Sequence, residues 1–303
     1  MRRFAKSLSL AVISGLWGLA TFGSAHAQKL KVYISVDMEG IAGVVSDQQL
    51  SPTGFEYARF REFMTAEALA AINGAKEAGA TEIVVSDSHG NMQNLLIERF
   101  PADVQIVRSS PRPLSMMQGI DSTFDAAIFI GYHSGTANPQ GVRAHTMSSA
   151  RYAGIDINGS PAAESRVNAA IAGYYGVPVV LITGDDIATA ELKSVLGDVE
   201  TAVVKRAIGF HSAITSTPEA AQNLIKERTK AALQRRASFK PYKVANPVRL
   251  DVTFKSYRPA EILAYLPIVE RTTSHAIRYN GRNIIDVMRF MVFVGAYTVE
   301  LDP

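Results

Sequence analysis

From residue 31 onward, short apolar runs alternate with longer segments of helical period, and this alternation restricts the chain to a small group of folds. Such alternation is typical of a mainly parallel β-sheet whose faces are covered by helices. Residues 55–78 are rich in Ala, Glu, Met and Leu and precede Gly79, which predicts a helix with a glycine at its end. We therefore predict an α/β fold, a mainly parallel sheet flanked by helices, with strands over 31–38, 81–88, 104–108, 126–133, 177–183 and 199–205.

Two later parts of the chain depart from this pattern. Residues 152–157 alternate and lead into Asn158-Gly159, a strong tight-turn signal, so we predict a β-hairpin over 150–163, set into the α/β core. Pro218 begins a long basic helix that extends to about residue 238, and a linker follows at residues 240–242. After the linker we predict a smaller α+β C-terminal subdomain of order β-α-β-α, over residues 248–254, 260–266, 271–278 and 283–297.

The predicted domain division follows from these elements. An α/β domain is expected over residues 28–240 and the smaller subdomain over residues 241–303. The last predicted helix is apolar and carries Met288, Phe290, Met291 and Phe293, which we expect to pack inside the protein rather than to form an interface.

The first 27 residues have the pattern of a secretory signal peptide. Arg2, Arg3 and Lys6 precede an apolar run over residues 8–22, and small residues at Ala25 and Ala27 predict cleavage before Gln28. A retained membrane anchor is the alternative, but about 15 apolar residues are short for a bilayer span. With no second long apolar stretch and no Cys for lipid attachment, we expect a periplasmic or secreted protein without a membrane partner after cleavage.

Charge and cysteine content narrow the possible partners. The leader carries three positive charges and no negative ones, so the formal charge of +3 falls to zero in the mature chain. A nucleic-acid partner is therefore not expected, since no basic face is implied. The absence of Cys means that the fold must be held by burial alone, which a chain of this length can do.

Polar side chains with metal-binding potential follow several of the predicted strands. Asp37 and Glu39 end the first strand, and residues two apart on a strand point to the same face. His89 follows the second strand and His133 follows the strand over 126–133, so all four are expected at the carboxyl edge of the sheet, where open α/β sheets bind ligands. A lone histidine after a strand is usually structural, but two beside a carboxylate pair indicate a metal site.

Glu164 opens the helix that follows the hairpin, where an acid is ordinarily explained by the helix dipole. As a fifth ligand it completes a set of two imidazoles and three carboxylates, which suits Zn, Mn or Fe better than Ca or Mg. Five protein ligands are too many for one catalytic zinc with an open position. They suit two ions roughly 3.5 to 4 Å apart that share a bridging carboxylate.

Five motifs in order make the chain resemble the DppA-type D-aminopeptidases. They are Val36-Asp-Met-Glu-Gly-Ile-Ala-Gly, Ser86-Asp-Ser-His-Gly, Gly131-Tyr-His-Ser, Gly141-Val-Arg-Ala-His145-Thr-Met and the Glu164 helix. The resemblance runs from about residue 30 to the C-terminus. It implies two Zn²⁺ per subunit, with Asp37 as the bridging ligand, and a catalytic role for His145. It also implies short peptides with N-terminal D-residues such as D-alanine as substrates, and a homo-oligomer, a decameric ring.

Two features depart from the family pattern. The stretch from His133 to His145 carries one additional residue, with 138–141 as its loosest part, so the loop that presents His145 is expected to differ. Without the resemblance, His145 in a polar loop would fit an exposed residue equally well. The leader is the second departure, and it indicates that substrate is supplied in the periplasm rather than in the cytoplasm.

The expected mechanism uses the two ions to lower the pKa of a bridging water, with His145 shuttling a proton or stabilising the tetrahedral intermediate. The alternatives are another dinuclear metal-dependent amidohydrolase or phosphoesterase, and a non-enzymatic periplasmic metal- or solute-binding protein. Asp185 and Asp186 end a further strand, where they could support a ligand histidine or cap the next helix. His26, His211 and His275 lack neighbouring ligand types and stay outside the predicted site.

Overall fold

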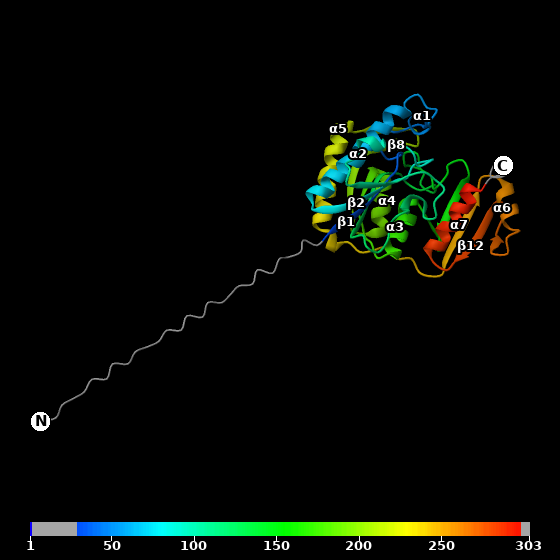
Figure 1. Ribbon diagram of the computed structural model, residues 1–303. Helices are drawn as coiled ribbons and strands as arrows, with labels where there is room; N and C mark the ends of the chain where they lie inside the picture. The colour runs from blue at the N-terminus through cyan, green and yellow to red at the C-terminus, as the bar shows by residue number, and fades with distance from the viewer. Residues whose placement is uncertain (2–28, 298–303) are drawn as a thin grey trace.

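The computed structural model describes Met1 and residues 29–297, so the predicted leader at residues 1–27 lies almost entirely outside the described residues. A seven-stranded sheet of order β3-β2-β1-β4-β7-β8-β9 forms the larger part of the molecule (Figure 1). All neighbouring strands are parallel except β8 and β9. The strands are β1 (Leu30–Val36), β2 (Ala80–Asp87), β3 (Val104–Val107), β4 (Ala126–Tyr132), β7 (Val179–Asp185), β8 (Glu200–Gly209) and β9 (Ser212–Thr215). The predicted α/β class and its mainly parallel sheet are confirmed.

Helices cover both faces of this sheet. α2 and α5 contact each other and cover one face, while α3 and α4 lie against the other (Figure 1). Successive side chains of β1 point to opposite faces of the sheet. Val32 and Ile34 therefore pack in the core beneath α2 and α5, whereas Tyr33 packs in the core around α3. The helices of this part are α1 (Asp47–Leu50), α2 (Tyr57–Glu77), α3 (Glu164–Tyr174), α4 (Asp186–Leu196) and α5 (Pro218–Gln234). Short 3₁₀ turns are η1 (Ile97–Arg99), η2 (Ser115–Met117) and η3 (Arg236–Ser238).

A second, antiparallel sheet has five strands in the order β11-β12-β10-β5-β6. The predicted hairpin is present, with Asn158 and Gly159 at φ values of +52° and +79° in its turn. It is not set into the main sheet, however, because β5 pairs with β10, where Ile155 lies opposite Val252. The strands are β5 (Tyr152–Ile157), β6 (Ser160–Pro161), β10 (Val248–Phe254), β11 (Val269–Arg271) and β12 (Ala276–Gly281).

The C-terminal part differs from its predicted order in one element. The single strand predicted over 271–278 is two strands, β11 and β12, that pair with each other in antiparallel fashion. Because β5 joins β10, the second sheet contains strands from both sides of the predicted boundary between residues 240 and 241. The division into two domains stays a prediction. The helices here are α6 (Tyr257–Leu263) and α7 (Ile284–Ala296).

Helix α7 packs mainly inside the protein. Met288, Phe290 and Met291 are buried, and the ring of Phe290 stacks on Tyr279 with centroids 4.2 Å apart. Phe293, the fourth apolar residue singled out on this helix, is exposed. α7 also contacts α3, so one hydrophobic core runs from the main sheet through α3 to the second sheet. No helix among the described residues has the length and apolar character that a membrane span requires.

Candidate metal centre

Three neighbouring strands of the main sheet end side by side and carry four of the predicted site residues. Asp37 and Glu39 come after β1, His89 comes after β2, and His133 comes directly after β4. Since β1 lies between β2 and β4, these side chains meet at one edge of the sheet. Glu164, the first residue of α3, completes the set. All five side chains are buried, with exposed fractions between 1% and 9%.

Two glycines allow the loop after β1 to press against the end of β4. A Cβ on Gly40 would lie 2.1 Å from the carbonyl oxygen of Tyr132, and one on Gly131 would lie 2.3 Å from that of Asp37. The Gly40 N–H also donates to the carbonyl oxygen of Gly131 at 2.7 Å. No larger residue fits at either position without moving the backbone. This close approach brings Asp37 against His133.

The five side chains form two groups of three that share Asp37. In the first, Nδ1 of His89 lies 2.9 Å from Oε2 of Glu39 and 3.5 Å from Oδ1 of Asp37. In the second, Nε2 of His133 lies 3.3 Å from Oδ2 of Asp37 and 3.6 Å from Oε2 of Glu164. Within each group, the potential ligand atoms lie within 4.8 Å of one another. These are two adjoining groups of potential ligands with one common carboxylate.

Both imidazoles are oriented by backbone carbonyls. Nε2 of His89 donates to the carbonyl oxygen of Leu50, and Nδ1 of His133 donates to that of Ser134, each at 3.0 Å. A carbonyl only accepts, so in the neutral rings the opposite nitrogens face the carboxylates with lone pairs. Lone pairs facing carboxylate oxygens repel, and Oδ2 of Asp37 is buried without a hydrogen-bond partner. A cation among these atoms resolves both problems, and metal-binding histidines are commonly oriented in this way.

The pKa shifts describe the same electrostatic conflict. Burial alone would lower the pKa of the His89 and His133 imidazoles, but the carboxylates of Glu39 and Glu164, together with Asp37, raise both well above the ordinary value. Burial would raise the pKa of Glu39, but the neighbouring histidines hold this pKa well below its usual range. Burial and the charge of Glu39 both raise the pKa of Asp37. A cation placed beside Asp37 would oppose both effects and favour its ionised form.

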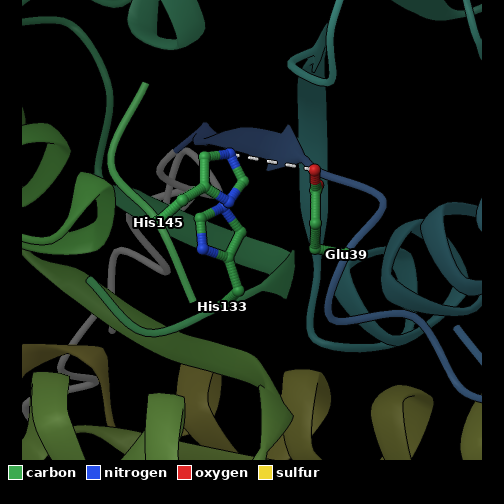
Figure 2. A group of neighbouring side chains, drawn as sticks. All are labelled: Glu39, His133 and His145. Atoms are coloured by element: carbon green, nitrogen blue, oxygen red, sulfur yellow. Dashed lines mark ion pairs between the residues drawn. The ribbon is translucent and has the colours of Figure 1, made fainter. Parts of the chain in front are cut away.

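His145 lies beside the two groups, in the loop between β4 and β5. Its Nδ1 donates to the carbonyl oxygen of Arg143 at 2.8 Å, and its Nε2 lies 3.9 Å from Oε1 of Glu39 and 3.7 Å from Oε1 of Glu164. Figure 2 shows its ring stacked over His133, with the line to Glu39 marked. Glu39, His133 and His145 form a third group able to hold an ion. The loop between β4 and β5 thus brings His145 to the centre, where proton transfer and metal binding are both possible.

The acids at the end of β7 act on backbone rather than on the ligand histidines. The side chain of Asp185 caps α4, as one of the two interpretations from sequence predicted, and it also accepts a hydrogen bond from the Val142 N–H in the loop that carries His145. Asp186 accepts from the Ala207 N–H on β8. Asp185 therefore helps to position the His145 loop.

Lys205 is a buried cation whose role the sequence did not indicate. Its Nζ donates to the carbonyl oxygens of Glu39, Ile41 and Val44, at 2.5, 3.1 and 2.7 Å. Burial lowers its pKa to about 8. These bonds fasten the loop after β1, and with it Glu39, to strand β8.

Asp87, two residues before His89, organises the loop after β2. Its carboxylate accepts hydrogen bonds from the N–H groups of Asn94 and Leu95, at 2.5 and 2.7 Å. The Asn94 side chain in turn donates to the carbonyl oxygen of His89 at 2.7 Å. This acid belongs to the Ser86-Asp-Ser-His-Gly motif, but no pattern in the sequence indicates its role. The structure shows that it holds the backbone of a candidate ligand.

The remaining histidines lie elsewhere. His275 contacts Ser274 and His211 packs on Phe210, and neither belongs to the three ligand groups found among residues 29–297, in agreement with the prediction. His26 lies outside the described residues. The five buried candidates and His145 surround a cavity of about 90 Å³.

The chain is similar to known D-aminopeptidases in sequence and in structure. The sequence model of a family described as D-aminopeptidase, Peptidase_M55, matches residues 30–293. A D-aminopeptidase of Bacillus subtilis (strain 168) is 35% identical over 265 residues, which are 87% of this chain and 96% of the relative. A solved structure described as "Zn-dependent D-aminopeptidase DppA from Bacillus subtilis, a self-compartmentalizing protease" has a TM-score of 0.85 and 33% identity, over 89% of this chain and 99% of that chain.

Proposed function

The chain belongs to the D-aminopeptidase family and is a zinc-dependent D-aminopeptidase, and we propose on this premise that its centre holds two zinc ions that share Asp37. The observation that carries the proposal is the pair of ligand groups with Asp37 in common, one with Glu39 and His89 and the other with His133 and Glu164. A catalytic zinc commonly uses three protein ligands and keeps one position open. Two ions that share a carboxylate satisfy this rule in both groups.

The proposed substrates are short peptides that begin with a D-residue such as D-alanine. The support is the D-aminopeptidase family of the chain and of its relatives.

Zinc bound at this centre would lower the pKa of a coordinated water and polarise the scissile carbonyl. The chain's own contribution to proton transfer is assigned to His145. With Nδ1 engaged by the carbonyl oxygen of Arg143, only Nε2 is available to take up a proton and pass it to the leaving amine. Glu39 and Glu164, at 3.9 and 3.7 Å, stabilise the imidazolium while it carries that proton.

The test of the function compares substrates on one purified, zinc-loaded protein. D-Alanyl anilide should be cleaved, L-alanyl anilide should be cleaved far more slowly, and an aryl phosphate should not be cleaved. Turnover should vanish with a chelator and return with zinc. Phosphate release without anilide cleavage would instead identify a phosphoesterase, and zinc binding without any turnover would identify a binding protein.

We propose that the protein acts outside the cytoplasm, in the periplasm or as a secreted enzyme. The support is the sequence of the leader, with Arg2 and Arg3 before the apolar run and alanines at the cleavage positions. The family match begins only at residue 30, after this segment. The substrates would then be peptides present outside the inner membrane, including fragments of peptidoglycan.

We also propose that the chain forms a homo-oligomer, a decameric ring by resemblance to the family. The related structure is described as a self-compartmentalizing protease. Large apolar side chains that lie exposed in the single chain support an interface: Phe55, Ile208, Ile214, Tyr265 and Ile268. Light scattering that returned a monomer at assay concentration would contradict this proposal and leave the metal centre unaffected.

A further inference from the structure

A larger cavity, of about 520 Å³, adjoins the metal centre between the loops after β2 and β3, the loop before β5, and helix α7. It shares four lining residues with the small metal cavity, so the two cavities adjoin at these residues, which form the opening between them. The shared residues are Gly90, Met92, Ser115 and Met147. Gly90 follows His89 directly, and the Met147 N–H donates to Oε1 of Glu164 at 2.6 Å. The opening between the cavities is therefore built from residues that touch the metal centre.

All four residues at this opening have left-handed backbone conformations. The φ angles are +53° at Gly90, +60° at Met92, +46° at Ser115 and +64° at Met147. Such values are uncommon for residues other than glycine, so they cost free energy at Met92, Ser115 and Met147. Residues with such backbone conformations cluster at binding and catalytic sites, and this favours a functional role for the opening.

The larger cavity is lined by cationic groups without acidic ones. Arg112 and Arg151 line it, and no aspartate or glutamate is among the lining residues in the described part of the chain. Ser110, Ser115 and Ser148 add hydroxyl groups. The remaining walls are mainly apolar: Met92, Pro111, Met147, Tyr152, Met288, Met291, Val292 and Ala296. A ligand that fits this space has an apolar body and a negative charge.

Arg112 has hydrogen-bonding capacity that the protein leaves unused. Its Nε donates to the carbonyl oxygen of Ser115 at 2.8 Å, and its Nη2 donates to Oγ of Ser86 and to the carbonyl oxygen of Asp87 at 2.9 and 2.6 Å. Nη1 is buried and has no partner. The side chain is thus fixed by three bonds while one nitrogen stays unsatisfied, which is costly unless a ligand supplies an acceptor.

We infer that this larger cavity binds the part of a short peptide beyond the scissile bond, and that Arg112 and Arg151 bind its C-terminal carboxylate. Arg112 lines the cavity and is held in place by its three hydrogen bonds. Arg151 is exposed at the rim, where its Nη1 donates to the carbonyl oxygen of Gly295 on α7. Guanidinium groups suit carboxylates because several donors lie in one plane. The methionines of the wall adapt to different side chains, so this cavity would select for a free carboxylate more than for one particular residue.

This inference rests on the proposed function, and its test separates the two. D-Alanylglycine and D-alanylglycinamide differ only at the C-terminal carboxylate, and both release D-alanine. We expect the wild-type enzyme to show a kcat/KM about 10- to 100-fold higher for the acid than for the amide, the worth of a charge-assisted hydrogen bond. Equal values for the two substrates would overturn the inference while leaving the D-aminopeptidase function intact. Release of D-alanine from neither compound would count against the proposed function itself.

Substitutions assign the effect to the two arginines. Arg151→Gln should lower kcat/KM for the acid and leave that for the amide unchanged, so the acid-to-amide ratio falls toward one. Arg112→Gln should lower the same ratio, whatever its effect on the amide alone. Arg108→Gln is the matched control, since Arg108 is exposed, lies close in sequence and does not line the cavity. Arg112 also braces the strand before His89, so zinc content is measured in every variant. If Arg112→Gln loses zinc, the wild-type ratio and Arg151→Gln still decide. A wild-type ratio near one overturns the inference, and so does an unchanged ratio in Arg151→Gln.

Discussion

The imidazole rings of His133 and His145 stack with their centroids 4.1 Å apart and their planes within 8° of parallel. Each ring is anchored through Nδ1 to a backbone carbonyl, and each presents Nε2 to Glu164. The two histidines thus approach the same carboxylate from adjacent positions, one as a candidate ligand and the other as the candidate proton carrier. Experiments on either residue must therefore measure zinc and turnover separately.

Replacing Asp37 should empty both zinc sites. Asp37→Ala removes the ligand common to the two groups, so we expect zinc to fall from about two ions per chain toward none. His133→Ala removes a ligand from one group only and should lower the zinc content toward about one ion. Metal analysis of dialysed, folded protein checks both values. Undiminished zinc in Asp37→Ala would contradict the shared-carboxylate assignment, even if activity were lost for another reason.

Replacing Lys205 should destabilise the fold and loosen the loop that carries Glu39. Lys205→Met keeps the apolar stem but leaves the carbonyl oxygens of Glu39, Ile41 and Val44 without their donor. We expect a loss of about 3 kcal/mol in the free energy of unfolding, together with weaker zinc binding. Arg206→Met is the matched control, because Arg206 is the next residue on β8 and is exposed. Equal denaturation midpoints for the two variants would show that Lys205 does not hold the loop.

Much of the centre can be predicted from sequence because it depends on local pattern. The buried strands are apolar runs, and the carboxyl ends of adjacent parallel strands must meet at one edge. Asp37, His89 and His133 immediately follow such runs, so their convergence follows from the order of the strands. The turn at Asn158-Gly159 was predictable for the same reason, since its signal lies in two adjacent residues.

Other features depend on contacts between distant parts of the chain. The hairpin was assigned to the wrong sheet because its partner β10 lies nearly a hundred residues later, and alternation alone does not identify a partner. Alternation likewise places Lys205 with Val203 on the outer face of β8, whereas Lys205 is buried beside Val204. The β7–β8 pairing shifts register at Lys205, and its acceptors come from the loop after β1. The residues next to β5 and to Lys205 in the sequence do not indicate either contact.

Glu67 should make stability depend on pH. Burial raises the pKa of this carboxyl to about 7, although a bond from the Ala42 N–H and the charge of Lys205 oppose the shift. Below pH 4.5 the group is protonated in both states and has no effect. As pH rises from about 4.5 to 7, the unfolded chain ionises first, so stability falls, and above pH 7 the loss is complete.

Glu67→Gln should remove this loss because the amide oxygen can still accept the Ala42 bond. The difference in unfolding free energy between variant and wild type should shift in favour of the variant by up to about 3 kcal/mol between pH 4.5 and pH 7.5. Chemical denaturation at both pH values measures it, and the titration of the metal centre cancels in the difference. Glu62→Gln, on the exposed side of the same helix, should show no such shift. A Glu67→Gln curve parallel to wild type across this range would refute the assignment.

Export should leave a shortened chain. The leader sequence predicts cleavage before Gln28, so intact mass analysis of protein recovered from a periplasmic extract should match a chain that begins near this residue. Replacing Ala25 and Ala27 by larger residues should block processing and leave the longer form. Intact Met1 on active protein found only in the cytoplasm would exclude the export proposal.

The final prediction separates metal binding from proton transfer at His145. If its Nε2 carries a proton during the reaction, His145→Ala should keep the zinc content, the fold and substrate affinity. Turnover should nevertheless fall by about 10² to 10⁴, the usual contribution of a positioned acid-base group. The loss should appear in kcat more than in KM, because a group that acts on the transition state contributes little to ground-state binding.

The control for this experiment is His275→Ala, which removes a partly exposed histidine outside all three ligand groups found in the described part of the chain and should leave both kcat and zinc unchanged. Two results at His145 would reject the proton-transfer role. A near-normal kcat in His145→Ala would mean that the ring does not take part in the reaction, despite lying within 4 Å of Glu39 and Glu164. A loss of zinc together with activity would make His145 a sixth ligand, which the third group, with Glu39 and His133, permits geometrically.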